Sequence, residues 1–151
     1  WQQTDADPAH VVSVNHWRED AVSAGRANLL PAFRLDIATG VLPPPADSGR
    51  WDAVFSANLV HIAPWNVAEG LFHAAAAALA PGGALVTYGP YRIDGAHTAP
   101  SNEAFDASLR ARDSRWGVRD RADLLAITDA FSLERTLPMP AENFVLVFRR
   151  R

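Results

Sequence analysis

The side chains of this 151-residue sequence that are best suited to chemistry lie at or just after the ends of two short apolar segments, WDAVFSA at 51–57 and ALVTYG at 84–89. They are Asn58, His61, Tyr88, Tyr91 and Arg92. An amide such as that of Asn58 both donates and accepts hydrogen bonds, so it suits a zwitterionic amino-acid ligand. His61 and Tyr91 could deprotonate or orient a nucleophile, which is the role of a general base. The alternative for His61 is a structural role at a helix start.

A long polar loop follows the second segment, at residues 90–101, and leads from Tyr91 and Arg92 past His97 to Asn102. Polar loops of this length inside a compact domain are usually functional or mobile. We expect no carboxylate partner for His97, and no group of His, Asp and Glu has the spacing of metal ligands. We therefore predict no metal site.

Two aspartates follow other strand-like segments. Asp5 ends the first of these, where a carboxylate can accept hydrogen bonds from both ribose hydroxyls of an adenosine. The alternative is that Asp5 and Asp7 cap the helix that follows. Asp36 closes the second segment, where it can accept from an adenine amino group while Ile37 packs against the ring. An exposed loop aspartate is the alternative for Asp36.

These residues require a scaffold in which strand ends meet. The strand 52–57, the helix 64–79 and the strand 84–89 form a predicted βαβ unit, and ligands bind outside the carboxyl ends of such strands. Five consecutive alanines at 74–78 favour a helix that packs closely on a sheet. The Pro-Gly-Gly sequence at 81–83 ends that helix.

The remaining elements complete an α/β pattern in one predicted domain, residues 1–151. The last two strands are joined by residues 138–142, and this short connection favours an antiparallel hairpin. We predict an open sheet that is mainly parallel with a reversed edge region. A proline-rich connection covers residues 42–48. The other predicted helices cover residues 8–24, 102–112 and 120–130, and the other predicted strands cover residues 1–4, 33–37, 131–137 and 143–149.

Composition argues against several classes of function. The net charge of −3 and the pI of about 5.9 give no global basic footprint, so we expect no nucleic-acid partner. The arginines at 149–151 indicate a solvated tail rather than a phosphate contact. The sequence has no cysteine, which excludes disulfides and a cysteine nucleophile and fits a reducing cytosol. No apolar run approaches the ~18 residues of a membrane span, so we expect a cytoplasmic protein without a membrane partner.

Three stretches carry a resemblance to a known family. They are WQQTDAD at 1–7, ANLVHIAPW at 57–65 and PGGALVTYGPYRIDGAHTAPSNEAFDASLRARDSRWGVRD at 81–120. The chain resembles the class I S-adenosylmethionine-dependent methyltransferase-like family of unknown function that includes methyltransferase-like protein 26. The resemblance implies a Rossmann-like sheet that is mostly parallel with a C-terminal antiparallel hairpin, and it implies S-adenosylmethionine as the cofactor.

The resemblance also implies residue roles. Asp5 would hold the ribose, Asp36 and Ile37 would flank the adenine, and Asn58 would lie near the methionine portion of the cofactor. The methyl-acceptor side would be lined by His61, Tyr88, Tyr91, Arg92, His97 and Asn102. His61 and Tyr91 are then the candidate catalytic residues.

One feature of the family is absent from this sequence. Members begin with a strand and a glycine-rich turn of the type E-x-x-x-G-x-G, and this chain starts after that point. We therefore expect a sheet that lacks its central first strand, between residues 1–4 and 52–57, and carries unpaired backbone groups there. We also expect the 151 residues alone to bind cofactor poorly, or only with a partner strand.

The leading hypothesis is methyl transfer from S-adenosylmethionine to an acceptor that the sequence does not identify, either a small molecule or a peptide. A catalytically silent binding or scaffold module on the same fold is the alternative. A nicotinamide-dependent enzyme is a third reading, since Asp5 would suit that ribose too, but the terminal hairpin argues against it. The oligomeric state is not determined by the sequence.

Overall fold

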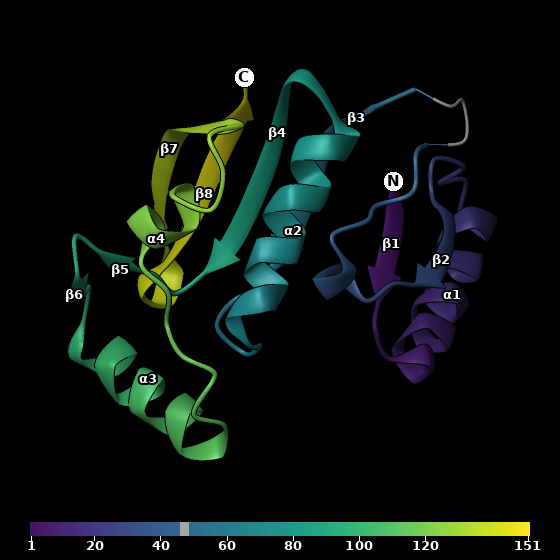
Figure 1. Cartoon of the computed structure of the whole chain (residues 1–151). Coiled ribbons are helices and arrows are strands. Elements are labelled where there is room, and N and C mark those ends of the chain that lie inside the picture. The colour runs from purple at the N-terminus through teal and green to yellow at the C-terminus, as the bar shows by residue number, and fades with distance from the viewer. Residues whose placement is uncertain (46–48) are drawn as a thin grey trace. The chain divides into compact units, whose positions relative to one another are not determined.

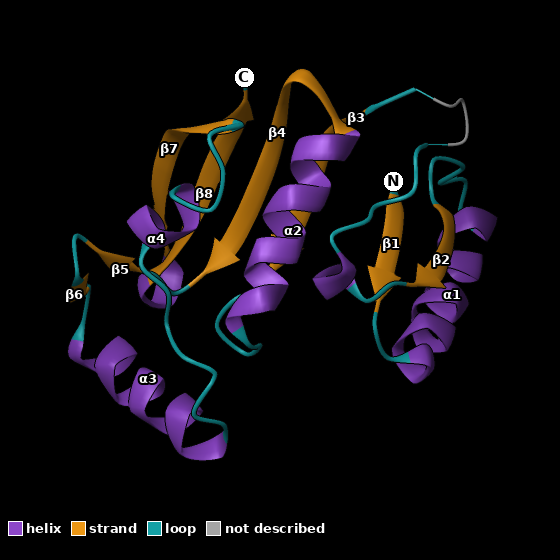
Figure 2. Ribbon diagram, viewed as in Figure 1, coloured by secondary structure: helices purple, strands orange, loops and turns teal. Residues whose placement is uncertain are grey.

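A computed structural model describes residues 1–45 and 49–151 of the chain (Figure 1). These residues form two compact units, Trp1–Ile37 and Ala38–Arg151. Each unit is built of strands and helices (Figure 2), so the predicted α/β class is confirmed. The predicted proline-rich connection at 42–48 includes residues 46–48, which lie outside the described residues.

The first unit is a single βαβ motif. Strands β1 (Gln2–Asp5) and β2 (Leu30–Arg34) pair in parallel, and helix α1 (Pro8–Ser23) joins them. The helix begins as predicted, because the Asp7 carboxylate accepts a hydrogen bond from the backbone N–H of Ala9 at 2.8 Å.

Strand β2 lies earlier than the predicted strand at 33–37. Its partner β1 ends at Asp5, which pairs with Arg34, so the ladder of hydrogen bonds ends there too. The chain then turns, and Ile37 begins a short 3-10 helix, η1 (Ile37–Thr39). The length of the partner strand, which is a tertiary property, therefore set the end of β2.

The second unit contains a mixed sheet with the strand order β3-β4-β8-β7. Strands β3 and β4 pair in parallel, whereas β4 with β8 and β8 with β7 pair antiparallel, which confirms the predicted C-terminal hairpin. The hairpin turn contains a 3-10 helix, η2 (Pro140–Glu142). The strands are β3 (Trp51–Ala57), β4 (Leu79–Gly89), β7 (Phe131–Met139) and β8 (Asn143–Arg150).

Helix α2 (Trp65–Ala78) connects β3 to β4 and completes the predicted βαβ unit (Figure 2). Its Phe72 side chain is fully buried and packs edge-to-face on Phe148, with ring centroids 5.0 Å apart, and on Phe131 at 5.8 Å. Ala74 and Ala75 of the alanine run are fully buried as well. Their small side chains let the helix approach the sheet closely, as the sequence predicts.

Two boundaries differ from the sequence-based expectation. Strand β4 begins at Leu79, directly after α2, and the Pro-Gly-Gly sequence lies in an irregular stretch where the register with β3 shifts between Trp51 and Ala53. The last helix, α4 (Arg121–Leu125), is shorter than the predicted helix at 120–130. Asp120 caps it, and the chain leaves it to enter β7.

The long loop after β4 contains a small hairpin that the prediction missed. Strands β5 (Arg92–Ile93) and β6 (Ala96–His97) pair antiparallel around Asp94 and Gly95. Both turn residues have positive φ, 54° and 84°, which is the Asp-Gly pattern of a tight hairpin turn. Helix α3 (Pro100–Arg112) follows at once. The Asp-Gly pair was therefore a usable sequence signal.

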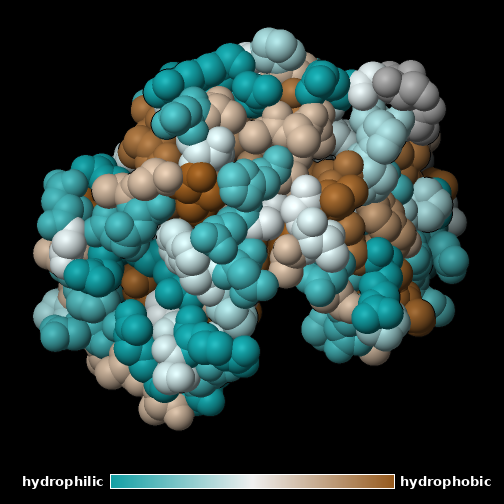
Figure 3. All heavy atoms as spheres, viewed as in Figure 1, coloured by the Kyte–Doolittle hydropathy of each residue, from teal (hydrophilic) through white to brown (hydrophobic). Residues whose placement is uncertain are grey.

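Exposed apolar side chains are interspersed with hydrophilic ones on the face drawn in Figure 3. Two large apolar side chains in the second unit, Ile62 and Phe105, are exposed by 42% and 36%. Both line the cavity described below. Among the helices described, none combines the length and the apolar character that crossing a membrane requires.

Candidate functional site

A cavity of about 430 Å³ lies at the carboxyl ends of β3 and β4, where the sequence predicted a site. Four polar side chains line it: Asn58, His61, Asn102 and Asn143. The other lining residues are Ile62, Pro90, Phe105 and Ala141. The structure thus brings together three of the predicted site residues, two from the turn after β3 and one from α3.

His61 is the titratable residue of this cavity. Its side chain is buried, with 3% exposure, and its ring packs edge-to-face on Phe105 with centroids 5.7 Å apart. Burial, together with the positive charge of Arg119, lowers the pKa of His61 to about 4. The imidazole is therefore neutral near pH 7 and can accept a proton.

The position of His61 depends on close packing against the end of β4. A Cβ atom at Gly89 would lie only 3.0 Å from Cε1 and 3.2 Å from Nδ1 of His61, so only glycine leaves room for the ring. Nδ1 is enclosed and has no hydrogen-bond partner among the described residues. Nε2 is not among these enclosed atoms without a partner, so we assign Nε2 as the ring nitrogen that a ligand would contact.

Asn58 starts the turn that carries His61. It adopts a left-handed conformation with φ of 54°, which asparagine tolerates better than most residues. Its backbone N–H donates to the carbonyl of Tyr88 at 2.8 Å, which ties the turn to β4. The exposed amide side chain of Asn58 lines the cavity.

Asn102 of α3 also lines the cavity. Its buried side-chain nitrogen donates to the Thr98 hydroxyl at 3.0 Å and to the carbonyl of Glu142 at 2.9 Å. Glu142 and Ala141 belong to the turn between β7 and β8, and both have positive φ, 56° and 58°. The amide of Asn102 therefore fastens this strained turn to α3.

Tyr88 and Tyr91 lie away from the cavity lining. Tyr91 is fully buried, its hydroxyl donates to Thr87 Oγ1 at 2.8 Å, and burial raises its pKa to about 12. A hydroxyl enclosed in this way is poorly placed to deprotonate a ligand, so the structure favours a structural role for Tyr91 over the predicted catalytic one. Tyr88 is half-buried within β4 and pairs with Ala57 and Val145.

Arg92 and His97 belong to the β5–β6 hairpin, and neither is among the residues that line the cavity. The Arg92 guanidinium donates to the carbonyl of Gly95. His97 does have a carboxylate neighbour, since its Nε2 lies 3.8 Å from Oδ2 of Asp106 on α3. The prediction that His97 has no carboxylate nearby considered helical spacing alone, whereas the hairpin brings His97 against the next helix.

Asp106 is held by further contacts. Burial alone would raise its pKa, but hydrogen bonds from Arg110 and from the backbone N–H of Val118 hold it below the ordinary value. The carboxylate is thus a fixed anion between α3 and the segment that follows it. In the part of the chain that the structure describes, no group of three His, Asp or Glu residues comes close enough together to bind a metal ion.

The predicted adenosine residues lie in the first unit. Asp5 Oδ1 accepts from the backbone N–H of Asp7 at 2.8 Å, and Oδ2 lies 3.3 Å from Nδ1 of His10. The backbone N–H of Leu35 donates to the carbonyl of Asp5 at 2.9 Å, so Asp36 follows directly beside the end of β1. The structure therefore places Asp5 at the carboxyl end of β1 and Asp36 two residues beyond the carboxyl end of the adjacent parallel strand β2.

Two kinds of cavity residue were missed in the sequence. Phe105 lies three residues after Asn102 on the same helix, and this helical spacing was a usable signal. Ala141 and Asn143 reach the cavity only because the β7–β8 hairpin returns to the end of β4, where Gly89 pairs with Phe144. No local pattern in the sequence predicts that contact.

The family described as "Protein of unknown function (DUF938)" matches residues 1–150. The chain belongs to this family. The match covers nearly all of the sequence, including both units and every predicted site residue. The family description assigns no activity.

Several solved structures, two of them of O-methyltransferase family proteins, share the fold. An O-methyltransferase family 2 protein from Planctomyces limnophilus, in complex with apigenin, has a TM-score of 0.76 at 15% identity over 99% of this chain and 43% of that chain. An O-methyltransferase family protein from Burkholderia thailandensis has a TM-score of 0.72 at 16% identity, with 99% and 43% covered. OxaC, in complex with SAH and oxaline, has a TM-score of 0.69 at 14% identity, with 99% and 35% covered.

The chain spans less than half of the length of each of these three proteins. Identities below 20% show a shared fold and leave the chemistry open. The predicted Rossmann-like methyltransferase fold is therefore confirmed.

Proposed function

We propose that this chain is part of an S-adenosylmethionine-dependent methyltransferase that acts on an oxygen nucleophile. The observation that carries the proposal is the neutral, buried His61 at the carboxyl ends of β3 and β4, in a cavity lined by amides. The fold that the chain shares with O-methyltransferases supports this proposal. The proposal also includes a relationship between this chain and methyltransferase-like protein 26. When bound, the cofactor would supply an electrophilic methyl group on a sulfonium sulfur.

The described residues fit the adenosine portion of this cofactor. Asp5 ends β1 and Asp36 follows the end of the adjacent strand β2 by two residues, which suits one carboxylate for the ribose and one for the adenine amino group. Each oxygen of Asp5 has one contact, and a carboxylate oxygen can accept two hydrogen bonds. Asn58, which lines the cavity of the second unit, has an exposed amide of the kind that hydrogen-bonds amino and carboxylate groups.

His61 would act as the general base. Because its ring is neutral at pH 7, Nε2 can take up the proton of a bound hydroxyl as that oxygen attacks the methyl group. For Nε2 to accept, the ring proton must be on Nδ1, the enclosed nitrogen. Phe105 fixes the ring orientation through its edge-to-face contact, which keeps the accepting nitrogen aligned.

The cavity walls favour an uncharged acceptor, whether a small molecule or a peptide side chain. None of the described residues that line the cavity is Asp, Glu, Lys or Arg, so a charged acceptor would lose its hydration without a compensating ion pair. Ile62 and Phe105 offer apolar surface, whereas Asn58 and Asn143 offer hydrogen bonds. An apolar molecule that carries a hydroxyl fits this lining.

The test is calorimetric titration of the full-length protein with S-adenosylhomocysteine. We expect binding, and we expect Asp5→Ala to weaken it by about 10- to 100-fold because charge-assisted hydrogen bonds to the ribose are lost. Asp7→Ala is the matched control, since Asp7 only caps α1 and should leave affinity within a few fold. Absence of binding by the unmodified protein would contradict the proposal and favour a silent scaffold.

A second measurement separates cofactor binding from catalysis. His61→Gln should retain S-adenosylhomocysteine affinity but lower methyl transfer to hydroxyl-bearing acceptors by about 10²- to 10⁴-fold, the usual contribution of a general base. Transfer would be followed as S-adenosylhomocysteine release across a panel of neutral and charged alcohols. Equal turnover by the variant and the unmodified protein would remove His61 from the mechanism.

A further inference from the structure

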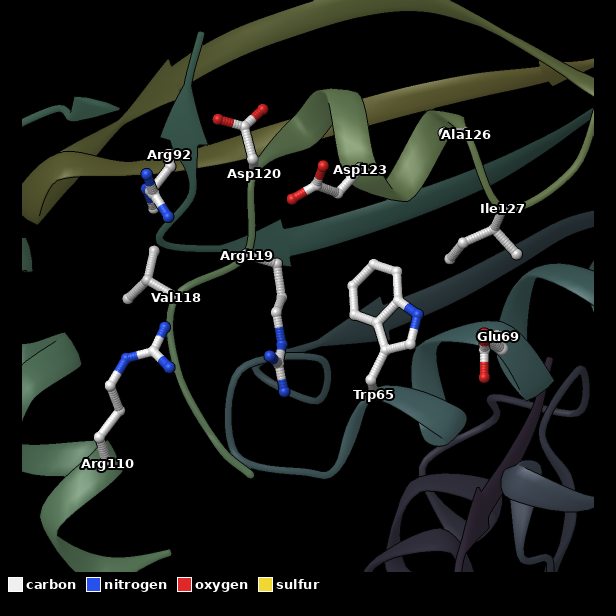
Figure 4. Close-up of a pocket in the computed structure, with 10 residues that line it drawn as sticks. All are labelled: Trp65, Glu69, Arg92, Arg110, Val118, Arg119, Asp120, Asp123, Ala126 and Ile127. Carbon is white, nitrogen blue, oxygen red and sulfur yellow. The ribbon is translucent and has the colours of Figure 1, made fainter. Parts of the chain in front are cut away.

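A second hollow of about 480 Å³ lies near the candidate site and is lined by three arginines, Arg92, Arg110 and Arg119 (Figure 4). Their guanidinium groups already have partners in the protein, so the hollow does not present three free cations to a ligand. Arg92 donates to Gly95 and Arg110 to Asp106. Arg119 differs from the other two because its partners are backbone carbonyls around the His61 turn.

Arg119 makes three hydrogen bonds with one side chain. Its Nε donates to the carbonyl of Val60 at 3.0 Å, and one terminal nitrogen donates to the carbonyl of Ala63 at 2.8 Å and to that of Arg115 at 2.8 Å. Val60 and Ala63 flank His61 in the chain. We propose that Arg119 is a positioning residue that fixes the turn carrying His61, and so aims the imidazole into the candidate cavity.

A second contact fixes the same turn. We call the hydrogen bonds from Arg119 and Gly117 to the turn at residues 60–63 the clamp. The backbone N–H of Gly117 donates to the carbonyl of His61 at 2.9 Å, so the segment before Arg119 grips the same turn. The guanidinium also stacks over Trp65, the first residue of α2, at 5.6 Å from the ring centroid (Figure 4). The turn is therefore held to the segment that leads into α4 at residues 60, 61, 63 and 65.

The clamp is itself anchored. The carbonyl of Arg119 accepts from the backbone N–H of Arg92 at 2.8 Å, which ties it to the β5–β6 hairpin. The next residue, Asp120, accepts from the backbone N–H groups of Gly95 and Ala122 at 2.7 and 2.8 Å. Because both ends of the segment are fixed, the guanidinium has a defined position from which to hold the turn.

The positive charge of Arg119 also acts on His61, in addition to the hydrogen bonds that hold the turn. A cation near the ring disfavours protonation of His61, and burial, which the fixed turn maintains, disfavours it further. The charged groups that in turn act on Arg119 are Arg110 and Asp106, which have opposite signs. Removal of Arg119 should therefore both loosen the turn and make His61 more basic.

The experiment compares Arg119→Gln and Arg119→Lys with a matched control. Arg112→Gln removes a guanidinium that also stacks on a tryptophan, Trp116, at 5.6 Å, but that makes no hydrogen bond among the described residues. The first readout is hydrogen exchange of the Gly117 amide, which reports the grip on His61. The second is the His61 pKa from NMR titration of the ring protons. Neither readout requires methyl transfer.

We expect Gly117 exchange to accelerate by about tenfold in both Arg119 variants, since lysine lacks the planar fork that bridges two carbonyls. The His61 pKa should rise from about 4 toward 6.5 in Arg119→Gln and rise less in Arg119→Lys, which keeps the charge. Arg112→Gln should change neither quantity.

Unchanged Gly117 exchange and an unchanged His61 pKa in Arg119→Gln would overturn the clamp. If that variant does not fold, Arg119→Lys decides by its exchange rate alone. The value of the clamp for catalysis rests on the proposed function, under which Arg119→Lys should lower kcat more than it raises KM. If the clamp is confirmed by NMR while no methyl transfer occurs, only the proposed function fails.

Discussion

The two units of this chain share one motif but differ in how far the side chains of its helix are buried. In each, a helix joins two parallel strands: β1–α1–β2 in the first unit and β3–α2–β4 in the second. Of the described residues of α1, none is buried, and Trp17 is 74% exposed. In α2, Phe72 and the neighbouring alanines are fully buried against the sheet.

This contrast in burial shows what a βαβ motif requires in order to be stable. The second unit adds β8 and β7 to its parallel pair, and Phe131 and Phe148 from these strands enclose Phe72. The first unit has two strands, and Ala32 is the one buried apolar residue among its described positions. Since burial of apolar surface is the main source of stability, we expect the first unit to open at a lower free energy than the second.

The comparison is tested most strongly by removing the aromatic centre of the second unit. Phe72→Ala should lower the free energy of unfolding by about 3 to 5 kcal/mol, because it deletes a fully buried ring and leaves a cavity. Urea unfolding followed by circular dichroism measures this loss. Trp17→Ala on α1 is the control and should change stability by about 0.5 kcal/mol or less. Similar losses for the two variants would contradict the difference in burial.

The next largest effect is a pH dependence that belongs to the second unit. His61 has a pKa of about 4 when folded and about 6.5 when unfolded, so below pH 6.5 the unfolded state binds the proton first. Stability is therefore unaffected by this group above about pH 6.5 and falls by about 3 kcal/mol as the pH drops to about 4.

The measurement is urea unfolding between pH 7 and pH 4 for the unmodified protein and for His61→Asn. The variant lacks the titrating group, so its stability should decline less steeply over this range. The contributions of the other histidines cancel in the difference between the two curves. Parallel curves would show that His61 titrates normally in the folded protein.

The smallest effect compares matched helix caps in the two units. Asp120 is buried and accepts from the N–H groups of Ala122 and Gly95, so Asp120→Ala should cost about 2 kcal/mol. Asp7 is exposed and accepts from Ala9 alone, so Asp7→Ala should cost about 1 kcal/mol. Hydrogen exchange would place the second loss within α1. An equal cost at both caps would remove this distinction between the units.

Local signals in the sequence determined much of the fold. The Asp7-Pro8 pair predicted the start of α1, and the alanine run predicted a helix that packs on a sheet. The short connection 138–142 predicted the terminal hairpin. These features follow from helix capping, helix propensity and the length of chain between strands. Because each of these acts over a few residues, it can be predicted from a single sequence.

The end of β2 and the true neighbours of the candidate residues were decided by tertiary structure. Asn102 meets Glu142, 40 residues away, and Arg119 meets Val60, 59 residues away. Such contacts leave no periodic trace, because each depends on where a distant segment returns to the sheet. The sequence thus determined which side chains could do chemistry at the strand ends. The burial of His61, the burial of Tyr91 in the core and the hydrogen bonds of Arg119 to the turn that carries His61 depend on tertiary contacts.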